Sequence, residues 1–164
     1  MITIGIDPGT ARLGFGIVRA GDQPEALDFG VIETSSSSDM PQRLSGIFDA
    51  VTELIELHRP DVMAIEQLFF ARNVTTAIAV GQARGVVLLA AARAGIDVAE
   101  YSPSVVKQAV VGYGKADKGQ MQEMVRIILG LECVPTPDDA ADALAIAICH
   151  AQRAAFAARV ESSR

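Results

Sequence analysis

The sequence predicts an α/β domain, built on a five-stranded mixed sheet flanked by helices. Three short apolar segments, within residues 2–7, 13–18 and 26–34, follow one another with only short turns between them, which is typical of an antiparallel meander. Two further strands, 62–65 and 98–101, each follow a segment with helical periodicity. A strand reached through a helix is expected to run parallel to its neighbour, so the sheet should be mixed.

The first strand ends at an acidic residue, Asp7, which the turn-forming pair Pro8-Gly9 follows directly. In one interpretation Asp7 caps this turn through the local backbone, as Asp often does. In the other its half-buried carboxylate lies at the rim of the sheet and binds a partner or a metal ion. In the next strand, Gly14 and Gly16 indicate close approach by another element.

A second strand ends in the same way. Residues 40–58 have apolar positions at helical spacing, with Pro41 in the first turn, and the buried strand 62–65 then ends at Glu66. Glu66 and Asp7 are therefore expected to lie at one rim of the sheet. Phe69 and Arg72 follow in a loop, where an exposed aromatic ring could stack on an unpaired base, although core or turn packing is the commoner role.

The helix expected over residues 74–94 is apolar around most of its circumference and rich in alanine and glycine. Such a helix is buried either inside its own domain or against another chain. We favour a homodimer helix, because a chain of this length has little remaining sheet to cover it, and burial inside the domain is the alternative.

The middle of the chain carries all three lysines. Lys107 lies in a short helix expected over residues 103–111, and Lys115 and Lys118 lie in a glycine-containing loop, 112–118, before a helix over 119–129. Basic residues in such positions suit contact with phosphate, although a solvated surface would show the same pattern.

The last helix is expected to begin with Thr136 as N-cap and Pro137 as first helical residue. Acidic residues are favoured in the first turn of a helix, which is a structural explanation for Asp138 and Asp139. It does not explain Asp142, which stands among alanine, leucine and isoleucine residues and shares a helix face with Asp139.

Length and composition predict one domain over residues 1–157, followed by a frayed tail over 158–164. The two cysteines form neither a disulfide framework nor a zinc-binding pattern. We expect a cytoplasmic protein without a membrane span, because the chain opens directly into its first strand and the apolar run 85–92 is too short to cross a bilayer.

The net charge of −6 is unevenly distributed. Residues 1–66 carry a net charge of −7, residues 67–130 carry +3, and residues 131–164 carry −2. Charges farther away than about 10 Å are screened at moderate salt, so the local sign decides contact with phosphate. The acidic total therefore weakens a nucleic-acid hypothesis without excluding it.

Four acids, Asp7, Glu66, Asp139 and Asp142, would come from two strand ends and one helix. Carboxylates that converge repel one another unless cations lie between them, and an all-oxygen donor set suits Mg²⁺ or Mn²⁺. Two such ions can activate a water molecule and stabilise the leaving oxygen of a phosphodiester, so the acids suggest a metal-dependent phosphodiesterase.

Five blocks of sequence together resemble the RuvC family of bacterial Holliday-junction resolvases, in order and over residues 2–150. They are Gly5–Thr10, Ala64–Gln67, Gly81–Gly85, Val106–Gln108 and Asp139–Leu144. The resemblance implies an RNase H-like fold and a homodimer that nicks four-way DNA junctions symmetrically with two Mg²⁺ per active site, Mn²⁺ being able to substitute. It also implies a role in recombination and repair, with the RuvA and RuvB branch-migration proteins as partners.

The resemblance also assigns roles by position. Asp7, Glu66, Asp139 and Asp142 match the four metal-binding acids of the family. The chain departs from the family pattern at Asp138, which with Asp142 has i,i+4 spacing and is a competing ligand, and some relatives have His at the third acidic position.

Three further residues have counterparts in the family. Phe69 matches the aromatic residue proposed to stack on an opened base, and Lys107 and Lys118 match basic residues near the scissile phosphate.

Two other functional classes are open to the same residues. Phosphotransferases of the actin and sugar-kinase type also open with a strand, an Asp and a glycine turn, but they need a duplicated domain, and measured ATP binding would identify one. A related nuclease acting on RNA, or a non-catalytic junction binder, is the second alternative, and a cleavage assay separates these from a DNA resolvase.

Overall fold

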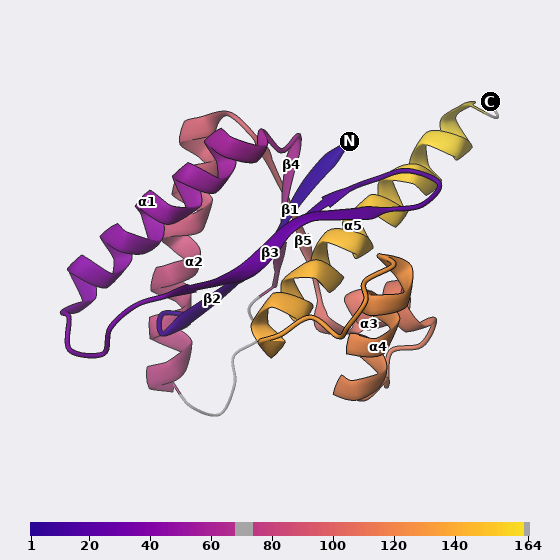
Figure 1. Cartoon of the computed structure of the whole chain (residues 1–164). Coiled ribbons are helices and arrows are strands. Elements are labelled where there is room, and N and C mark those ends of the chain that lie inside the picture. The colour runs from indigo at the N-terminus through magenta and orange to yellow at the C-terminus, as the bar shows by residue number, and fades with distance from the viewer. Residues whose placement is uncertain (68–73, 163–164) are drawn as a thin grey trace.

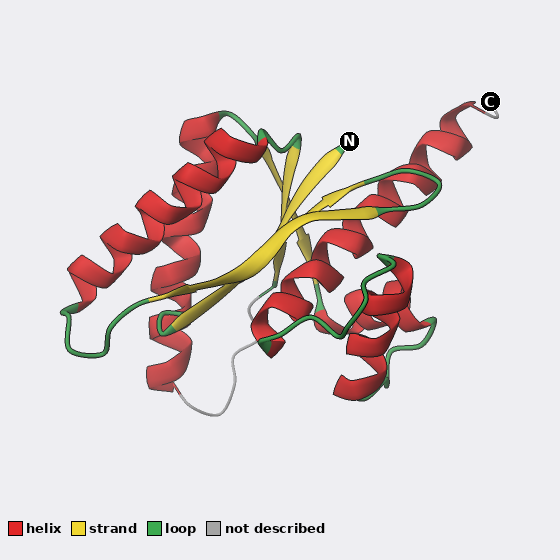
Figure 2. Ribbon diagram, viewed as in Figure 1, coloured by secondary structure: helices red, strands yellow, loops and turns green. Residues whose placement is uncertain are grey.

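The computed structural model describes residues 1–67 and 74–162 (Figures 1 and 2). In chain order the elements are β1 (Ile2–Asp7), β2 (Arg12–Arg19), β3 (Glu25–Glu33), α1 (Met40–His58), β4 (Val62–Glu66), α2 (Val74–Ala94), β5 (Asp97–Tyr101), α3 (Pro103–Val111), α4 (Lys118–Ile128) and α5 (Asp138–Ser162).

The five strands form one mixed sheet, as predicted, and their order in it is β3-β2-β1-β4-β5. Strands β1, β2 and β3 are antiparallel, whereas β4 runs parallel to β1, and β5 runs parallel to β4. Ile6 of β1 stands opposite Ile65 of β4. The acidic residues that follow them, Asp7 and Glu66, therefore lie side by side at the carboxyl edge of the sheet, which confirms their shared rim.

Helices cover both faces of this sheet. Figure 1 shows α1 and α2 on one side and α5, with α3 and α4, on the other. Successive residues of β1 point to opposite faces of the sheet. Ile4 and Ile6 belong to the core with α1 and α2, whereas Gly5 lies under α5. The core on the α5 face is formed largely by α3, α4 and α5.

Glycines in β1 and β2 allow α5 to lie directly on the sheet. A Cβ atom built on Gly5 would overlap the carbonyl oxygen of Ala143, and one on Gly14 would overlap the backbone of Asp139. At Gly16 it would lie 2.8 Å from the Leu144 backbone nitrogen, closer than real Cβ contacts allow. The close approach predicted at Gly14 and Gly16 is confirmed, and the element that approaches is α5.

Helix α2 has one buried face and one exposed apolar face. Ala83, Val87 and Ala91 are fully buried in the core shared with α1, whereas Ile78 and Leu89 are 59% and 52% exposed. Among the described residues, one helical stretch, Thr75–Ala94, is long and apolar enough to cross a membrane. Core helices of soluble proteins share this property, so it is weak support for a membrane span.

Two helix starts differ from the prediction. Helix α5 begins at Asp138, and the Pro137 carbonyl accepts a hydrogen bond from the Ala140 N–H at 3.0 Å, so Pro137 precedes the helix and Thr136 is not its N-cap. Lys118 is the first residue of α4 and not part of the preceding loop, because the Asp117 side chain caps the helix.

The segment that was expected to fray begins within α5. The helix continues past residue 157 as far as Ser162, with exposed side chains from Ala155 to Ser162.

Candidate active site

Three acidic side chains from different elements line one cavity of about 360 Å³. Asp7 reaches it from the end of β1, Glu66 from the end of β4, and Asp142 from the first turns of α5. Lys107 of α3 and Lys118 of α4 complete the charged part of its wall. The structure thus brings together residues that are up to 135 positions apart in the sequence.

The two neighbouring acids at the start of α5 have different surroundings. The backbone of Asp139 packs on Gly14, which is the residue opposite Asp7 in the β1–β2 pair, and the charge of Asp139 contributes to raising the pKa of Asp7. Asp138 is exposed and faces α4, where Lys118 and Gln122 both donate hydrogen bonds to it. These bonds lower the pKa of Asp138, whereas Asp139 takes the place nearer to Asp7.

The acidic side chains of the cavity resist ionisation. Burial raises the pKa of Asp7 to about 7, and the charges of Asp142, Glu66 and Asp139 add to this effect. Burial also raises the pKa of Glu66 and of Asp142. A half-buried group of like charges is stable in its ionised form only beside a positive charge, and a divalent cation would supply it.

The donor atoms fit a hard cation. The acids offer only carboxylate oxygens, which are the ligands of Mg²⁺ and Mn²⁺. Within residues 1–67 and 74–162, no three His, Cys, Asp or Glu side chains are grouped tightly enough to enclose a metal ion as they stand.

The predicted basic and aromatic residues fall into three groups. Lys107 lines the cavity, and its charge opposes the rise in the pKa of Glu66 and of Asp142. Lys118 stands at the cavity with its side chain 56% exposed, whereas Lys115 is exposed in the loop between α3 and α4 and does not line the cavity. Phe69 and Arg72 lie outside the described residues.

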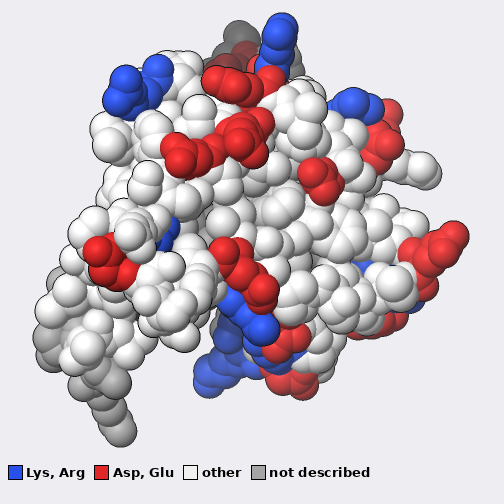
Figure 3. Space-filling model, turned by 60° about the vertical axis from the view of Figure 1, so that its left-hand side comes forward, with Lys and Arg blue, Asp and Glu red and all other residues white. Residues whose placement is uncertain are grey.

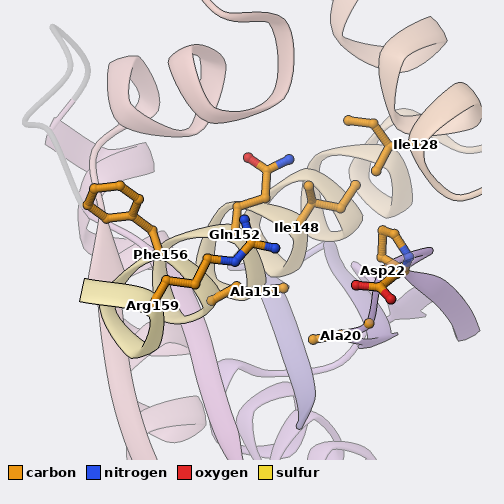
Figure 4. A pocket seen from close by; sticks show the side chains of 11 residues that line it. Ala20, Asp22, Ile128, Ile148, Ala151, Gln152, Phe156 and Arg159 are labelled. Carbon is orange, nitrogen blue, oxygen red and sulfur yellow. The ribbon is translucent and has the colours of Figure 1, made fainter. Parts of the chain in front are cut away.

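A larger cavity, of about 660 Å³, lies away from the acids. Figure 4 shows its lining, formed by Ala20 and Asp22 from the β2–β3 turn, Ile128 at the end of α4, and the C-terminal half of α5. None of the four candidate metal ligands lines it. In the face of the molecule seen in Figure 3, acidic and basic side chains are interspersed without a continuous basic surface.

Sequence reasoning missed the contact between Asp138 and α4. From the sequence, Asp138 is a helix-capping residue or a competing metal ligand, and its pair with Lys118 appears only in the structure. The sequence did contain a signal for the position of Lys118. Asp117 and Gln120 have the spacing of a capping box, which places Lys118 at a helix start, and the structure contains this capping box.

The comparisons with known proteins agree with this geometry. The sequence profile described as "Crossover junction endodeoxyribonuclease RuvC" matches residues 3–150. A relative of that name from Rubrobacter xylanophilus is 60% identical over 151 residues, covering 92% of this chain and 84% of the relative.

Two solved structures are similar over nearly the whole chain. The Thermus thermophilus RuvC structure has a TM-score of 0.90 and 41% identity, covering 96% of this chain and 97% of that one. The same protein in complex with a Holliday junction substrate has a TM-score of 0.88 and 39% identity, covering 95% and 96%. From the matched profile, these relatives and the acid-lined cavity at the edge of an RNase H-like sheet, we conclude that the chain belongs to the RuvC family of crossover junction endodeoxyribonucleases.

Proposed function

We propose that this protein is a structure-selective DNA endonuclease that resolves Holliday junctions by paired, symmetric nicks in homologous recombination and DNA repair. The observation that carries the proposal is the convergence of Asp7, Glu66 and Asp142 on one cavity in a member of the RuvC family. The Thermus relative, which is similar over 95% of this chain, has been solved with a Holliday junction substrate.

Nucleases of this family are metal-dependent, and we infer which residues of this chain hold the metal. Asp7, Glu66, Asp139 and Asp142 would hold two Mg²⁺ ions per active site, with Mn²⁺ as a substitute. When bound, the ions supply an activated water molecule and neutralise charge on the phosphodiester. The raised pKa of Asp7 supports the assignment, because this cluster needs positive charge in order to ionise near neutral pH.

The remaining residues of the cavity would act on the phosphate. Lys118, at the cavity mouth, would stabilise the negative charge that develops on the phosphate during in-line attack by water. The products would be a 5′-phosphate and a 3′-hydroxyl, which can be religated. Lys107, within the same cavity, would contact the DNA backbone beside the cleaved bond.

Three further residues would contact DNA outside the cavity. Phe69 would stack on an unpaired base at the junction centre, and Arg72 and Lys115 would contact backbone phosphates. Lys115 is exposed in the loop between α3 and α4, which supports such a contact.

We propose a homodimer in which helix α2 supplies the interface. Ile78, Gln82, Gly85 and Leu89 are all exposed and follow one another at spacings of three or four residues, so they share one face of α2. Two copies joined by a two-fold axis would place two active sites against a two-fold symmetric junction, as paired nicks require. By family resemblance, RuvA and RuvB would be further partners in the cytoplasm, and no membrane would be involved.

A cleavage assay tests the activity. We expect the purified protein with Mg²⁺ to nick a four-way DNA junction in two opposed strands and to leave duplex DNA and structured RNA largely intact. A chelator should abolish cleavage. Equal cleavage of linear duplex and junction would contradict structure selectivity, and cleavage in the presence of chelator would contradict the metal mechanism.

A further inference from the structure

Asp138 lies outside the acid-lined cavity but contacts a residue of its wall. The Asp138 Oδ2 atom accepts from the Lys118 Nζ atom at 2.7 Å, and the Asp138 Oδ1 atom accepts from the Gln122 Nε2 atom at 2.8 Å. Lys118 and Gln122 are four residues apart on α4 and therefore share one face of that helix. One carboxylate thus joins the start of α5 to the first turns of α4.

The backbone of Lys118 is fixed independently of this contact. The Asp117 carboxylate accepts a hydrogen bond from the Gln120 N–H at 2.9 Å, and the Gln120 side chain accepts from the Asp117 N–H at 3.0 Å. Tyr113 adds a third bond, donating its hydroxyl hydrogen to Gln120 at 2.9 Å. The first turn of α4 is therefore held in place without Asp138, and the contact of Lys118 with Asp138 involves its side chain and not its backbone.

The Lys118 ammonium group has two acidic neighbours at different distances. It is hydrogen-bonded to Asp138 at 2.7 Å, and it lies 3.9 Å from the Asp142 Oδ2 atom, which is too far for a hydrogen bond. Asp142 lines the cavity and is a proposed metal ligand, whereas Asp138 lines no part of it. Without Asp138, the Asp142 carboxylate remains within ion-pair distance of the ammonium group.

We propose that Asp138 is a positioning residue, which holds the Lys118 ammonium group at the cavity mouth and keeps it from moving into hydrogen-bond distance of Asp142. The ammonium group then stays available to the scissile phosphate, and Asp142 stays available to metal. This inference rests on the proposed nuclease function and adds a residue outside the four proposed metal ligands.

The proposed role predicts that loss of the Asp138 carboxylate affects DNA binding and cleavage differently. Asp138 is an exposed acid beside the cavity, so its removal lowers the repulsion of a polyanionic substrate and does not weaken DNA binding. The same change releases Lys118 and slows the chemical step. A residue that only stabilised the fold would instead lower the amount of active enzyme without changing the rate of the active fraction.

A double-mutant cycle on full-length protein tests the proposal. We expect Asp138→Asn to slow single-turnover cleavage of a four-way junction about fivefold, which is the scale of an exposed ion pair, with an unchanged or lower junction Kd. In a Lys118→Met background the same substitution should change the rate by less than about 1.5-fold, because its effect requires the ammonium group. A matched control is Glu123→Gln, which removes an equal charge from α4 beside Arg126 and should leave the rate unchanged.

Two kinetic results would overturn the proposal: wild-type single-turnover rates for Asp138→Asn, or an equal slowing in both backgrounds. A measurement without DNA or metal is the ¹⁵N cross-peak of the Lys118 ammonium group, which should be lost by fast solvent exchange in Asp138→Asn and retained in Glu123→Gln. A cross-peak unchanged in Asp138→Asn would also contradict it. If wild-type protein fails to cleave junctions at all, the proposed function is wrong, whereas these comparisons test the positioning role.

Discussion

At the scale of single residues, Asp7 links stability to function. The folded protein raises the pKa of its carboxyl group from 3.8 to about 7, because the side chain is buried beside three other acids. Between about pH 4 and pH 7 the folded chain therefore retains a proton that the unfolded chain has released, and the free energy of unfolding falls as pH rises through this window. The raised pKa values of Glu66 and Asp142 act with the same sign.

The first prediction concerns the metal-free stability of Asp7→Asn. At pH 7.5 we expect the variant to be more stable than the wild type by about 2 kcal/mol, because it removes an ionised carboxylate from an acidic cluster. Urea denaturation at pH 5 and pH 7.5 in the presence of chelator measures this, with Asp49→Asn, an exposed acid of α1, as control. A variant less stable than the wild type at pH 7.5 would contradict the prediction.

The second prediction concerns the activity of the same variant. Asp7→Asn should lower the rate of junction nicking at least about 100-fold, because it removes a proposed metal ligand. Its junction Kd should stay close to that of the wild type, since DNA contacts outside the cavity are intact. Gel-shift and single-turnover assays measure the two quantities, and full cleavage by the variant would remove Asp7 from the metal site.

At the scale of elements, the seating of α5 on β1 and β2 determines where its acids lie. The glycines at positions 5, 14 and 16 remove the side chains that would otherwise separate helix from sheet. Asp139 consequently lies over β2 beside Asp7, and Asp142 enters the cavity one helical turn later.

The third prediction tests this seating. Gly5→Ala places a methyl group against the Ala143 backbone, and we expect it to lower the free energy of unfolding by about 3 kcal/mol or more. Gly46→Ala is the control, because no atom lies within 4 Å of its added Cβ, and an alanine within α1 should stabilise the helix by about 0.5–1 kcal/mol. Denaturant unfolding measures both, and equal effects would show that α5 is not seated as described.

The same elements show which features of the fold could be predicted from the sequence. The mixed character of the sheet and the rim shared by Asp7 and Glu66 followed from alternation of apolar residues and from the helix that separates β1–β3 from β4, because both are local signals with a known geometric consequence. The start of α5 was misplaced by one residue, since Thr136 and Pro137 have the composition of a helix start but lie outside the helix.

The contacts between elements could not be predicted in this way. The choice between Asp138 and Asp139 depends on the rotation of α5 relative to β2 and α4, which no periodicity in α5 alone specifies. For the same reason the sequence predicted an apolar α2 but not its division into a buried and an exposed face.

At the scale of the whole molecule, the proposed dimer accounts for the exposed apolar face of α2. The fourth prediction is that Ile78→Glu combined with Leu89→Glu yields a monomer in sedimentation experiments, because the two changes place charges in the proposed interface. Phe156→Glu, which changes an apolar residue of α5 that is even more exposed, should leave the dimer intact. The monomer should lose coordinated cutting of opposed strands, and a dimer that survives both changes would place the interface elsewhere.

The central claim is that acids distant in the sequence hold divalent ions where a DNA backbone can reach them. The most direct measurement is anomalous diffraction from crystals of the protein soaked in Mn²⁺. We predict two manganese peaks in the cavity, coordinated by Asp7, Glu66, Asp139 and Asp142. A cavity without manganese peaks, or ions bound only outside it, would contradict the account.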